Sequence, residues 1–440
     1  MKLKQLFLSA AMLVFLPGIL AAQKTLTLQE CVLLGVEQNF SIRLARNYEE
    51  ITANNVTLGN AGFLPRISLS SQQSGVINNV EQELAGGGTN STRGAHNTTT
   101  SAGLSLNQTI FDGFRVQTTY QRLQEINQIG ELQTRFTIEN MVARIIAEYY
   151  YIIQQERLLS NLQYAVELSK ERARIDEERY LLGSGSKLQL LQSQVYLNAD
   201  SSRLGRQYET VRASRIRLNE LLALDDVTEM VYVQDTVIDV DPGLVYDYLL
   251  QATLSSNTAL LIASKNQVIS EFDRKIIASR SYPYLNFSSG YGMSYNTFQS
   301  GSLNNQRSMS ISYGLTLGFN IFDGFNQRRA LSNANIEIYN RELILQQIEQ
   351  ETRADLFTIY NAYVNNLRLL NLELQNLEIA RENLDIALER YKLGALAGLE
   401  LREVQKSLLD AEERLLFIQY QTKLAEISLL QISGKILSYL

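Results

Sequence analysis

The chain has 440 residues, of which 45% are hydrophobic and 20% charged, a composition typical of a folded protein with a large core. The net charge of −6 and the pI near 5.3 argue against a nucleic-acid binder, because phosphate contacts require clustered Lys and Arg that no segment supplies. The single cysteine, Cys31, excludes an internal disulfide framework and a cysteine-rich zinc site, and we expect it to be a buried helical thiol.

Residues 1–22 have the pattern of a cleaved secretory signal peptide. Lys2 and Lys4 precede an apolar stretch that ends in Ala21-Ala22-Gln23, which is the order of charged, apolar and small residues in such signals. We expect cleavage after Ala22 and export of the remainder. No later window approaches the 18 nearly uncharged residues of a transmembrane helix, so strands must cross the bilayer if this chain enters one.

Two motifs recur along the chain at one interval. Ile110-Phe111-Asp112-Gly113-Phe114 returns as Ile321-Phe322-Asp323-Gly324-Phe325, and Glu178-Arg179-Tyr180 returns as Glu389-Arg390-Tyr391. Both displacements are 211 residues (321 − 110 and 389 − 178), which indicates an internal duplication. The predicted domains are a first structural repeat at 23–224, an equatorial connector at 225–243 and a second structural repeat at 244–440.

Each repeat is expected to contain a helix, a β-hairpin, a very long helix and a return helix. The opening helices are predicted at roughly 27–61 and 244–280, and the hairpins at 64–112 and 282–323. The clearest strand runs from Met309 to Ile321, where odd positions are apolar and even positions are Ser, Gly, Thr or Asn. Such a strand can span the hydrocarbon layer with its apolar side chains toward lipid. The alternative is an amphipathic sheet on a soluble core.

The first hairpin shows the same alternation more weakly. Its strands are predicted around Ile67 and Leu69 and around Leu104 and Leu106, and a long loop containing Gly86-Gly87-Gly88 joins them. Four strands are too few to close a transmembrane barrel, and an open edge in lipid leaves unpaired backbone groups that cost several kcal/mol each. The barrel must therefore be shared, with eight strands in a dimer or twelve in a trimer, and the sequence alone leaves both open.

Two stretches are predicted to be exceptionally long helices, at 114–182 and 325–393. The first contains no proline and one glycine, Gly130, and the second contains neither residue. At 1.5 Å per residue, 69 residues make a helix of roughly 100 Å. Each long helix is expected to turn at a glycine-containing bend, and a return helix of about 37 residues follows.

Apolar residues on the second-repeat helices follow the 3-4 spacing of coiled-coil seams. The seam of the return helix comprises Leu401, Val404, Leu408, Ala411, Leu415, Ile418, Thr422 and Ala425. The seam of the long helix comprises Leu367, Leu370, Leu374, Leu377, Arg381, Leu384 and Leu388, and a second stripe comprises Leu372, Ile379 and Ile386. Two seams on one helix favour the wall of a closed helical tube, because each helix in a ring has two neighbours. A dimeric coiled coil is the alternative.

From Thr25 to Leu440 the chain resembles the TolC-type outer-membrane efflux proteins. The duplicated Phe-Asp-Gly junctions, the duplicated Glu-Arg-Tyr-x-x-Gly motifs and the opening Leu26-Thr27-Leu28-Gln29-Glu30-Cys31 carry the resemblance. It implies a membrane α+β fold: a homotrimer that shares a twelve-stranded transmembrane β-barrel in the cell outer membrane, continued by a long α-helical barrel in the periplasm. It also implies docking to a periplasmic adaptor (membrane fusion) protein and an inner-membrane transporter, in tripartite efflux or type I secretion.

Asp112 and Asp323 stand at the predicted strand-to-helix junctions, where a carboxylate can cap the first turn and complement the helix dipole. The tip turns are assigned to Gly183 with Gly185 and to Gly394 with Gly398. The resemblance places the closed periplasmic aperture of the channel at these turns.

Four residues near the tips are candidates for lining that aperture. Glu400 and Glu403 share one helix face and resemble the acidic constriction of the family, whereas Gln189 and Gln192 occupy the matching positions of the first repeat. Three copies would form a ring that attracts cations, and the alternative is a solvated helix face. Some family members carry a basic residue two positions after the tip glycine, where this chain has Gly185 and Leu396, so a gate held by those ion pairs is not expected.

The competing function classes are an enzyme and a structural periplasmic coiled-coil protein. The one histidine, His96, is predicted to lie in the loop of the first hairpin, and no nucleophile has a suitable spacing around it. We therefore expect no catalysis, no cofactor and no metal site, and the function predicted is that of a passive exit duct gated at its tip.

Overall fold

The structure is a computed structural model that describes residues 24–300 and 303–440. The predicted signal peptide at 1–22 lies outside the described residues. The chain divides into two compact units. The sheet unit comprises residues 45–135 and 258–351, and the helical unit comprises the residues up to Leu44 together with 136–257 and 352–440.

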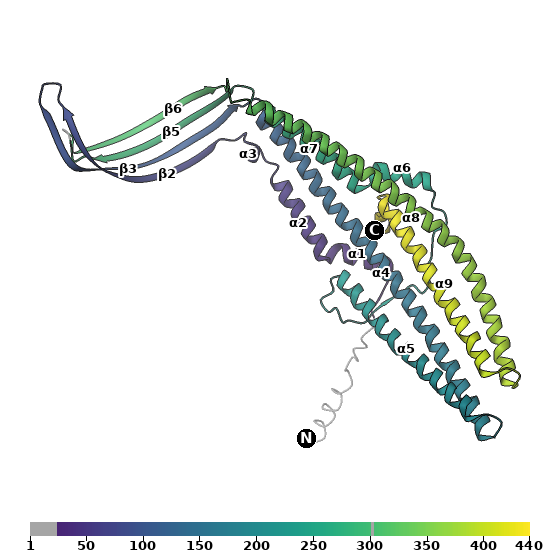
Figure 1. Ribbon diagram of the computed structural model, residues 1–440. Helices are drawn as coiled ribbons and strands as arrows, with labels where there is room; N and C mark the ends of the chain where they lie inside the picture. The colour runs from purple at the N-terminus through teal and green to yellow at the C-terminus, as the bar shows by residue number, and fades with distance from the viewer. Residues whose placement is uncertain (1–23, 301–302) are drawn as a thin grey trace, which may run out of the picture. The chain divides into compact units, whose positions relative to one another are not determined.

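The sheet unit contains one four-stranded antiparallel sheet in the order β2-β3-β5-β6 (Figure 1). The strands are β2 (Arg66–Glu83), β3 (Thr89–Phe111), β5 (Tyr284–Thr297) and β6 (Asn305–Gly318). Each predicted hairpin is therefore present, and β3 and β5 pair to join the two repeats. The outer strands, β2 and β6, each pair with one other strand of the described chain.

The two faces of this sheet differ in chemistry because side chains alternate along each strand. One row of register partners crosses all four strands with large apolar side chains: Leu69, Leu104, Tyr291 and Ile311. The next row crosses them with small residues: Ser70, Gly103, Gly292 and Ser310. The apolar row is uncovered within the chain, since Leu69 is 76% and Ile311 is 73% exposed.

The extents of the strands differ from the prediction in two places, the first loop and the end of β6. Only residues 84–88 separate β2 from β3, so the prediction of a long first loop is wrong. The prediction that His96 lies in that loop is wrong as well, because His96 lies on β3 opposite Ile77. The Thr- and Asn-rich segment lacks apolar alternation, but its backbone still pairs with β2 on both sides of an irregularity between Asn78 and Val80. In the second hairpin, β6 ends at Gly318 and not at Ile321, because Gly318 pairs with the first residue of β5, Tyr284, and no partner strand continues beyond it.

The long helices are confirmed. Helices α4 (Arg115–Leu181) and α8 (Asn326–Lys392) have 67 residues each, and the return helices α5 (Lys187–Leu221) and α9 (Gly398–Ile432) have 35 residues each. The starts of both pairs differ by 211 residues (326 − 115 and 398 − 187). The backbone also repeats, because Phe114 and Phe325 have positive φ angles of 68° and 62°.

The predicted opening helices are broken. The first consists of α1 (Leu28–Gln38), α2 (Phe40–Asn54) and α3 (Leu58–Ala61), and the second of α6 (Tyr246–Ser256) and α7 (Thr258–Ser279). The break after α1 is at Asn39 and that after α6 is at Asn257, where the backbone is extended (ψ of 128° and 119°).

Each break is stabilised by a contact with a distant helix end. Asn39 Nδ2 donates a hydrogen bond to the carbonyl of Leu221 and Asn257 Nδ2 donates one to the carbonyl of Ile432, both at 2.9 Å. These carbonyls close α5 and α9, where the last four carbonyls of a helix lack intrahelical donors. A single asparagine in each repeat thus ends one helix and caps another.

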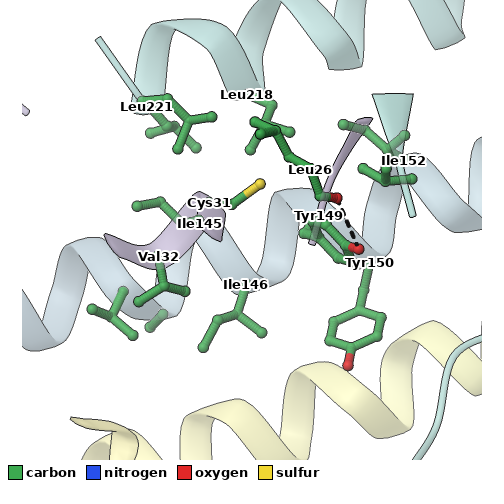
Figure 2. Packing of buried hydrophobic residues seen from close by; sticks show 14 of the residues in the cluster. Leu26, Cys31, Val32, Ile145, Ile146, Tyr149, Tyr150, Ile152, Leu218 and Leu221 are labelled. Carbon is green, nitrogen blue, oxygen red and sulfur yellow. Dashed lines mark hydrogen bonds between the residues drawn. The ribbon is translucent and has the colours of Figure 1, made fainter. Parts of the chain in front are cut away.

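The main core of the helical unit packs α1 against α4. Cys31 and Val32 are fully buried and belong to one cluster with Ile145 and Ile146 of α4 (Figure 2). The prediction that Cys31 is buried is confirmed, and burial raises the pKa of its thiol to about 12. The connector adds the short strand β4 (Val231–Val233), which pairs in parallel with β1 (Lys24–Leu26), and the chain ends in a 3₁₀ helix at Ile436–Tyr439.

The predicted seam of α9 is confirmed, because all of its residues are buried or half-buried. The seam of α8 is confirmed only in part, since Leu377 and Leu384 are buried but Leu374 is 46% exposed. Ala380, Ala387 and Tyr391 complete the buried face of α8 instead. Over the described residues, no helix is both long and apolar enough to cross a membrane.

One charged residue, Glu412, is buried beside the α9 seam. It is 8% exposed, its Oε2 atom has no hydrogen-bond partner among the described residues, and Arg381 lies 3.5 Å from Oε1. Burial raises the pKa of this carboxyl above its ordinary value of 4.5. The folded state therefore binds the proton more tightly than the unfolded state does, and the free energy of unfolding falls as the pH rises from 4.5 through the raised pKa.

We expect Glu412→Gln to raise the free energy of unfolding at pH 7 by on the order of 1 kcal/mol. Below pH 4 the wild-type carboxyl is protonated as well, so the difference between the two proteins should disappear. Thermal unfolding of the detergent-purified proteins across this pH range measures the difference. Glu413→Gln changes an exposed neighbour and should have no such effect, and a pH-independent difference for Glu412→Gln would contradict the prediction.

Candidate functional site at the helical tip

The turns between the long and return helices form the tip of the helical unit. Gly183 and Gly394 adopt left-handed φ angles of 70° and 78°, a conformation that glycine adopts readily at helix ends. A Cβ on Gly185 would stand 3.2 Å from the backbone nitrogen of Tyr180, so this position also requires a small residue. Gly398 is the first residue of α9 and lies outside the turn proper.

The two return helices begin differently. The hydroxyl of Ser186 accepts a hydrogen bond from the amide of Gln189, and the Gln189 side chain accepts one from the amide of Ser186, which is a complete capping box. At the matching place before α9 the residue is Ala397, which has no side chain that can cap. The first amides of α9 therefore lack the side-chain acceptor that those of α5 have.

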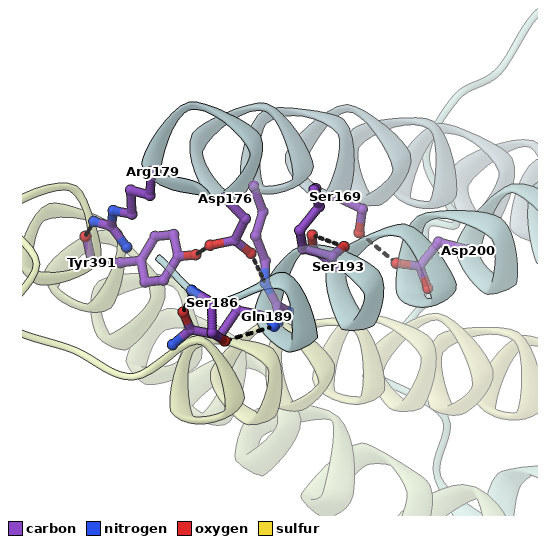
Figure 3. Close-up of polar contacts among 10 residues, drawn as sticks. Ser169, Asp176, Arg179, Ser186, Gln189, Ser193, Asp200 and Tyr391 are labelled. Carbon is purple, nitrogen blue, oxygen red and sulfur yellow. Dashed lines mark hydrogen bonds and ion pairs between the residues drawn. The ribbon is translucent and has the colours of Figure 1, made fainter. Parts of the chain in front are cut away.

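Tyr391 joins the long helix of one repeat to that of the other (Figure 3). Its hydroxyl donates a hydrogen bond to Asp176 Oδ1, and its carbonyl accepts one from Arg179 Nη2 at 2.5 Å. The Arg179 guanidinium also lies over the Tyr391 ring, 4.7 Å from its centre. Burial raises the pKa of Tyr391 to about 12, so the hydroxyl remains a donor at neutral pH.

Asp200 joins the two return helices. Its carboxylate accepts two hydrogen bonds from Arg402 of α9, at 2.7 and 2.9 Å, and a third from Ser169 of α4 at 2.6 Å. The Asp200 side chain is 2% exposed and that of Arg402 is 14% exposed. This bidentate, desolvated pair is of the stronger kind of ion pair.

A cleft of about 830 Å³ opens between the two turns. Among the predicted residues, Gln189, Gln192, Gly394 and Gly398 line it. Glu400 and Glu403 do not line it, and both side chains are exposed on α9.

These tip contacts, together with the buried Arg172, whose Nε lies 3.9 Å from Asp176 Oδ2, form the tip network. Four of its residues were in neither the predicted site nor the duplicated motifs: Arg172, Asp176, Asp200 and Arg402. Asp176 and Arg179 stand four and seven residues after Arg172 and so share one helix face. A charged row of this kind is usually solvated, and only the buried partners from the other repeat identify it as a contact. Tyr391, in contrast, belongs to the duplicated motif.

The strand-to-helix junctions of the sheet unit hold the remaining predicted residues. Asp112 Oδ1 accepts a hydrogen bond from the amide of Val116 at 3.3 Å, and Asp323 Oδ2 accepts one from the amide of Gln327 at 2.8 Å. Both amides lie in the first turn of a long helix, where they have no intrahelical partner. In residues 24–300 and 303–440, no group of three or more His, Cys, Asp or Glu is placed to hold a metal ion.

Comparison with known proteins gives one family and one fold. Residues 36–224 and 249–435 match the family model described as outer membrane efflux protein. A comparison with curated proteins found no match.

Several solved structures share the fold at low sequence identity. A membrane protein from Pseudomonas aeruginosa is 18% identical with a TM-score of 0.76, over 92% of this chain and 90% of that one. The outer membrane channel CmeC from Campylobacter jejuni is 15% identical with a TM-score of 0.75, over 93% and 85% of the two chains. The outer membrane protein VceC from Vibrio cholerae is 14% identical with a TM-score of 0.73, over 92% and 96%.

Proposed function

Because the chain belongs to the outer membrane efflux protein family, we propose that it is the exit duct of a tripartite efflux or type I secretion system, assembled from three copies and gated at its helical tip. The family consists of passive channels, so the chain is not an enzyme. Its members lie in the outer membrane with a helical part in the periplasm. The observation that carries the proposal is a four-stranded sheet whose apolar face is bare, on a chain with two very long helices.

The sheet supports a barrel that is shared between copies. Its apolar row from Leu69 to Ile311 is exposed across all four strands, which suits contact with lipid, and its other face carries small polar residues, which suits a wet interior. In a bilayer the outer edges of β2 and β6 must find partners, because each unpaired backbone group costs several kcal/mol there. Joining β6 of one copy to β2 of the next pairs both edges.

Three copies would give a barrel of twelve strands, which is the number that the resemblance to TolC-type proteins implies. The second stripe on α8 supports packing against a neighbouring copy: Leu372, Ile379 and Ile386 are 50%, 66% and 54% exposed within one chain. These apolar side chains face away from the seam that α8 makes with α9, as expected for a helix with a neighbouring copy on its other side.

The tip network supports gating at the turns. The contacts of Tyr391 with Asp176 and of Arg402 with Asp200 each connect the α4–α5 pair to the α8–α9 pair. Separating the pairs to widen a passage would break both contacts. The proposed partners that bring about this separation are a periplasmic adaptor protein and an inner-membrane transporter.

The proposal is tested by reconstituting the detergent-purified protein in planar bilayers and cross-linking it in parallel. Discrete conductance steps together with a cross-linked trimer from outer-membrane fractions would support the duct. The alternative function, a structural periplasmic coiled-coil protein, predicts recovery in the soluble periplasmic fraction and no conductance.

The charge at the aperture gives a separate prediction. Glu400 and Glu403 are exposed on one face of α9, and three copies would bring six carboxylates together. We expect Glu400→Gln with Glu403→Gln to reduce the preference for cations, measured as the reversal potential in a KCl gradient. Glu177→Gln with Glu178→Gln, exposed on the neighbouring α4, is the matched control. Unchanged selectivity in the first double variant would remove both residues from the ion pathway.

A further inference from the structure

The tip cleft is lined by a buried arginine, Arg172, that has unpaired hydrogen-bond donors. Arg172 is 5% exposed, and its Nε and Nη1 atoms have no hydrogen-bond partner among the described residues. The nearest carboxylate is that of Asp176, whose Oδ2 atom lies 3.9 Å from Nε and is too far for a hydrogen bond. The guanidinium also lies 5.1 Å from the centre of the Tyr196 ring. A buried guanidinium with free donors is costly unless an acceptor reaches it.

The first turn of α9 stands beside this guanidinium. A Cβ on Gly398 would be 3.3 Å from Arg172 Nη2, so the absence of a side chain leaves the guanidinium edge next to the helix start. This is the end of α9 that Ala397 leaves without a side-chain cap. Unpaired amides and the positive end of a 35-residue helix attract an anion.

The two carboxylates nearest to Arg172 in this network are already engaged by other donors. Three guanidinium groups, those of Arg172, Arg179 and Arg402, face two carboxylates, those of Asp176 and Asp200. Asp200 already accepts three hydrogen bonds and Asp176 accepts the Tyr391 hydroxyl. Lys392, which also lines the cleft, is paired with Glu389 at 2.9 Å.

We infer that the tip cleft is a carboxylate-binding site, formed by the Arg172 guanidinium and the uncapped amides at the start of α9. The two oxygens of a carboxylate suit a guanidinium edge together with backbone donors. Glu400, in the first turn of α9, is not among the residues that line the cleft, and its side chain is exposed. A bound carboxylate would connect α4 directly to α9. The inference rests on contacts inside one chain and does not require the proposed function.

The test uses crystals of the full-length, detergent-purified protein soaked with 4-bromobenzoate, and with the neutral 4-bromobenzamide as its isosteric comparison. The anomalous scattering of bromine then locates either probe. We expect a bromine peak in the cleft with the benzoate, its carboxylate toward Arg172, and no peak with the amide. No benzoate peak, or equal peaks for both probes, would overturn the inference, because charge would then not be what the cleft recognises.

Two variants examine the two halves of the site. Arg172→Met removes the guanidinium and Ala397→Asp supplies a carboxylate from the chain itself, so each should abolish the benzoate peak. Arg174→Met removes an exposed arginine that pairs with Glu171 and Glu178 on the same helix, and it should keep the peak.

If Arg172→Met does not fold, Ala397→Asp alone decides, and a peak that persists in it contradicts the assignment. The conductance of the same preparation tests the duct separately, so a conducting protein without a benzoate peak disproves only this site.

Discussion

Replacing Arg402 with Met is expected to open the tip. The Asp200 side chain is 2% exposed, and it would lose the two hydrogen bonds at 2.7 and 2.9 Å that neutralise it. Leaving one member of a buried ion pair without its partner costs roughly 3–5 kcal/mol. Asp200 is on α5 and Arg402 is on α9. The loss of their ion pair therefore destabilises the closed tip, in which the two return helices are in contact.

A penalty of this size shifts an equilibrium between closed and open tips by at least about 100-fold, since each 1.4 kcal/mol is a factor of ten. We therefore expect single channels of Arg402→Met to show larger conductance, or longer open periods, than the wild type in planar bilayers. A conductance and open periods equal to those of the wild type would contradict the prediction.

Two controls separate the buried charge from a general loosening of the tip. Arg203→Met removes an exposed arginine on α5 that lies 3.7 Å from Glu413, and surface pairs of this kind contribute little. It should leave the conductance unchanged. Asp200→Asn combined with Arg402→Met removes both charges, and it should open the tip less than Arg402→Met alone because no unpaired carboxylate remains.

The parts of the fold that depend on local sequence were predictable. Both 67-residue helices were predicted because each lies in a stretch with no proline and at most one glycine. The interval of 211 residues showed that the second of them repeats the first. Small residues alternating with apolar ones likewise located β5 and β6. In each case one segment carries the whole signal, through helix propensity or strand alternation.

The breaks in the opening helices could not be predicted in the same way. Asn39 is bound to the carbonyl of Leu221, which is 182 residues away, and Asn257 to that of Ile432, which is 175 residues away. An asparagine within a helical pattern is compatible with an uninterrupted helix. Tertiary contact decides the outcome, and a single sequence contains no sign of it.

The residues of the candidate site likewise differ in whether the local sequence predicts them. Gly183 and Gly394 were found because a helix that turns needs a residue with a left-handed backbone. The link between Asp176 and Tyr391 joins residues 215 positions apart, and that between Asp200 and Arg402 joins residues 202 apart. Each of these charged residues fits a solvated helix face as long as its partner from the other repeat is unknown.

Replacing Ile311 with Arg is expected to prevent assembly in the outer membrane. Ile311 is near the middle of β6, is 73% exposed, and belongs to the apolar row that crosses all four strands. In the proposed barrel this face contacts lipid, where an arginine at mid-depth costs about 2–4 kcal/mol. A trimer would carry that cost three times, so we expect at least a tenfold loss of heat-modifiable trimer from outer-membrane fractions.

The neighbouring residue provides the matched control, because side chains alternate between the two faces of a strand. Ser312 pairs with Gly290 in a row of small residues, and in the proposed barrel it faces the wet interior. Ser312→Arg introduces the same side chain one position along the same strand, and it should assemble normally and change only conductance. If Ser312→Arg failed to assemble and Ile311→Arg assembled, the small-residue face would be the one against lipid. Failure of both variants would show that β6 tolerates no arginine on either face, and it would leave the orientation of the sheet without support.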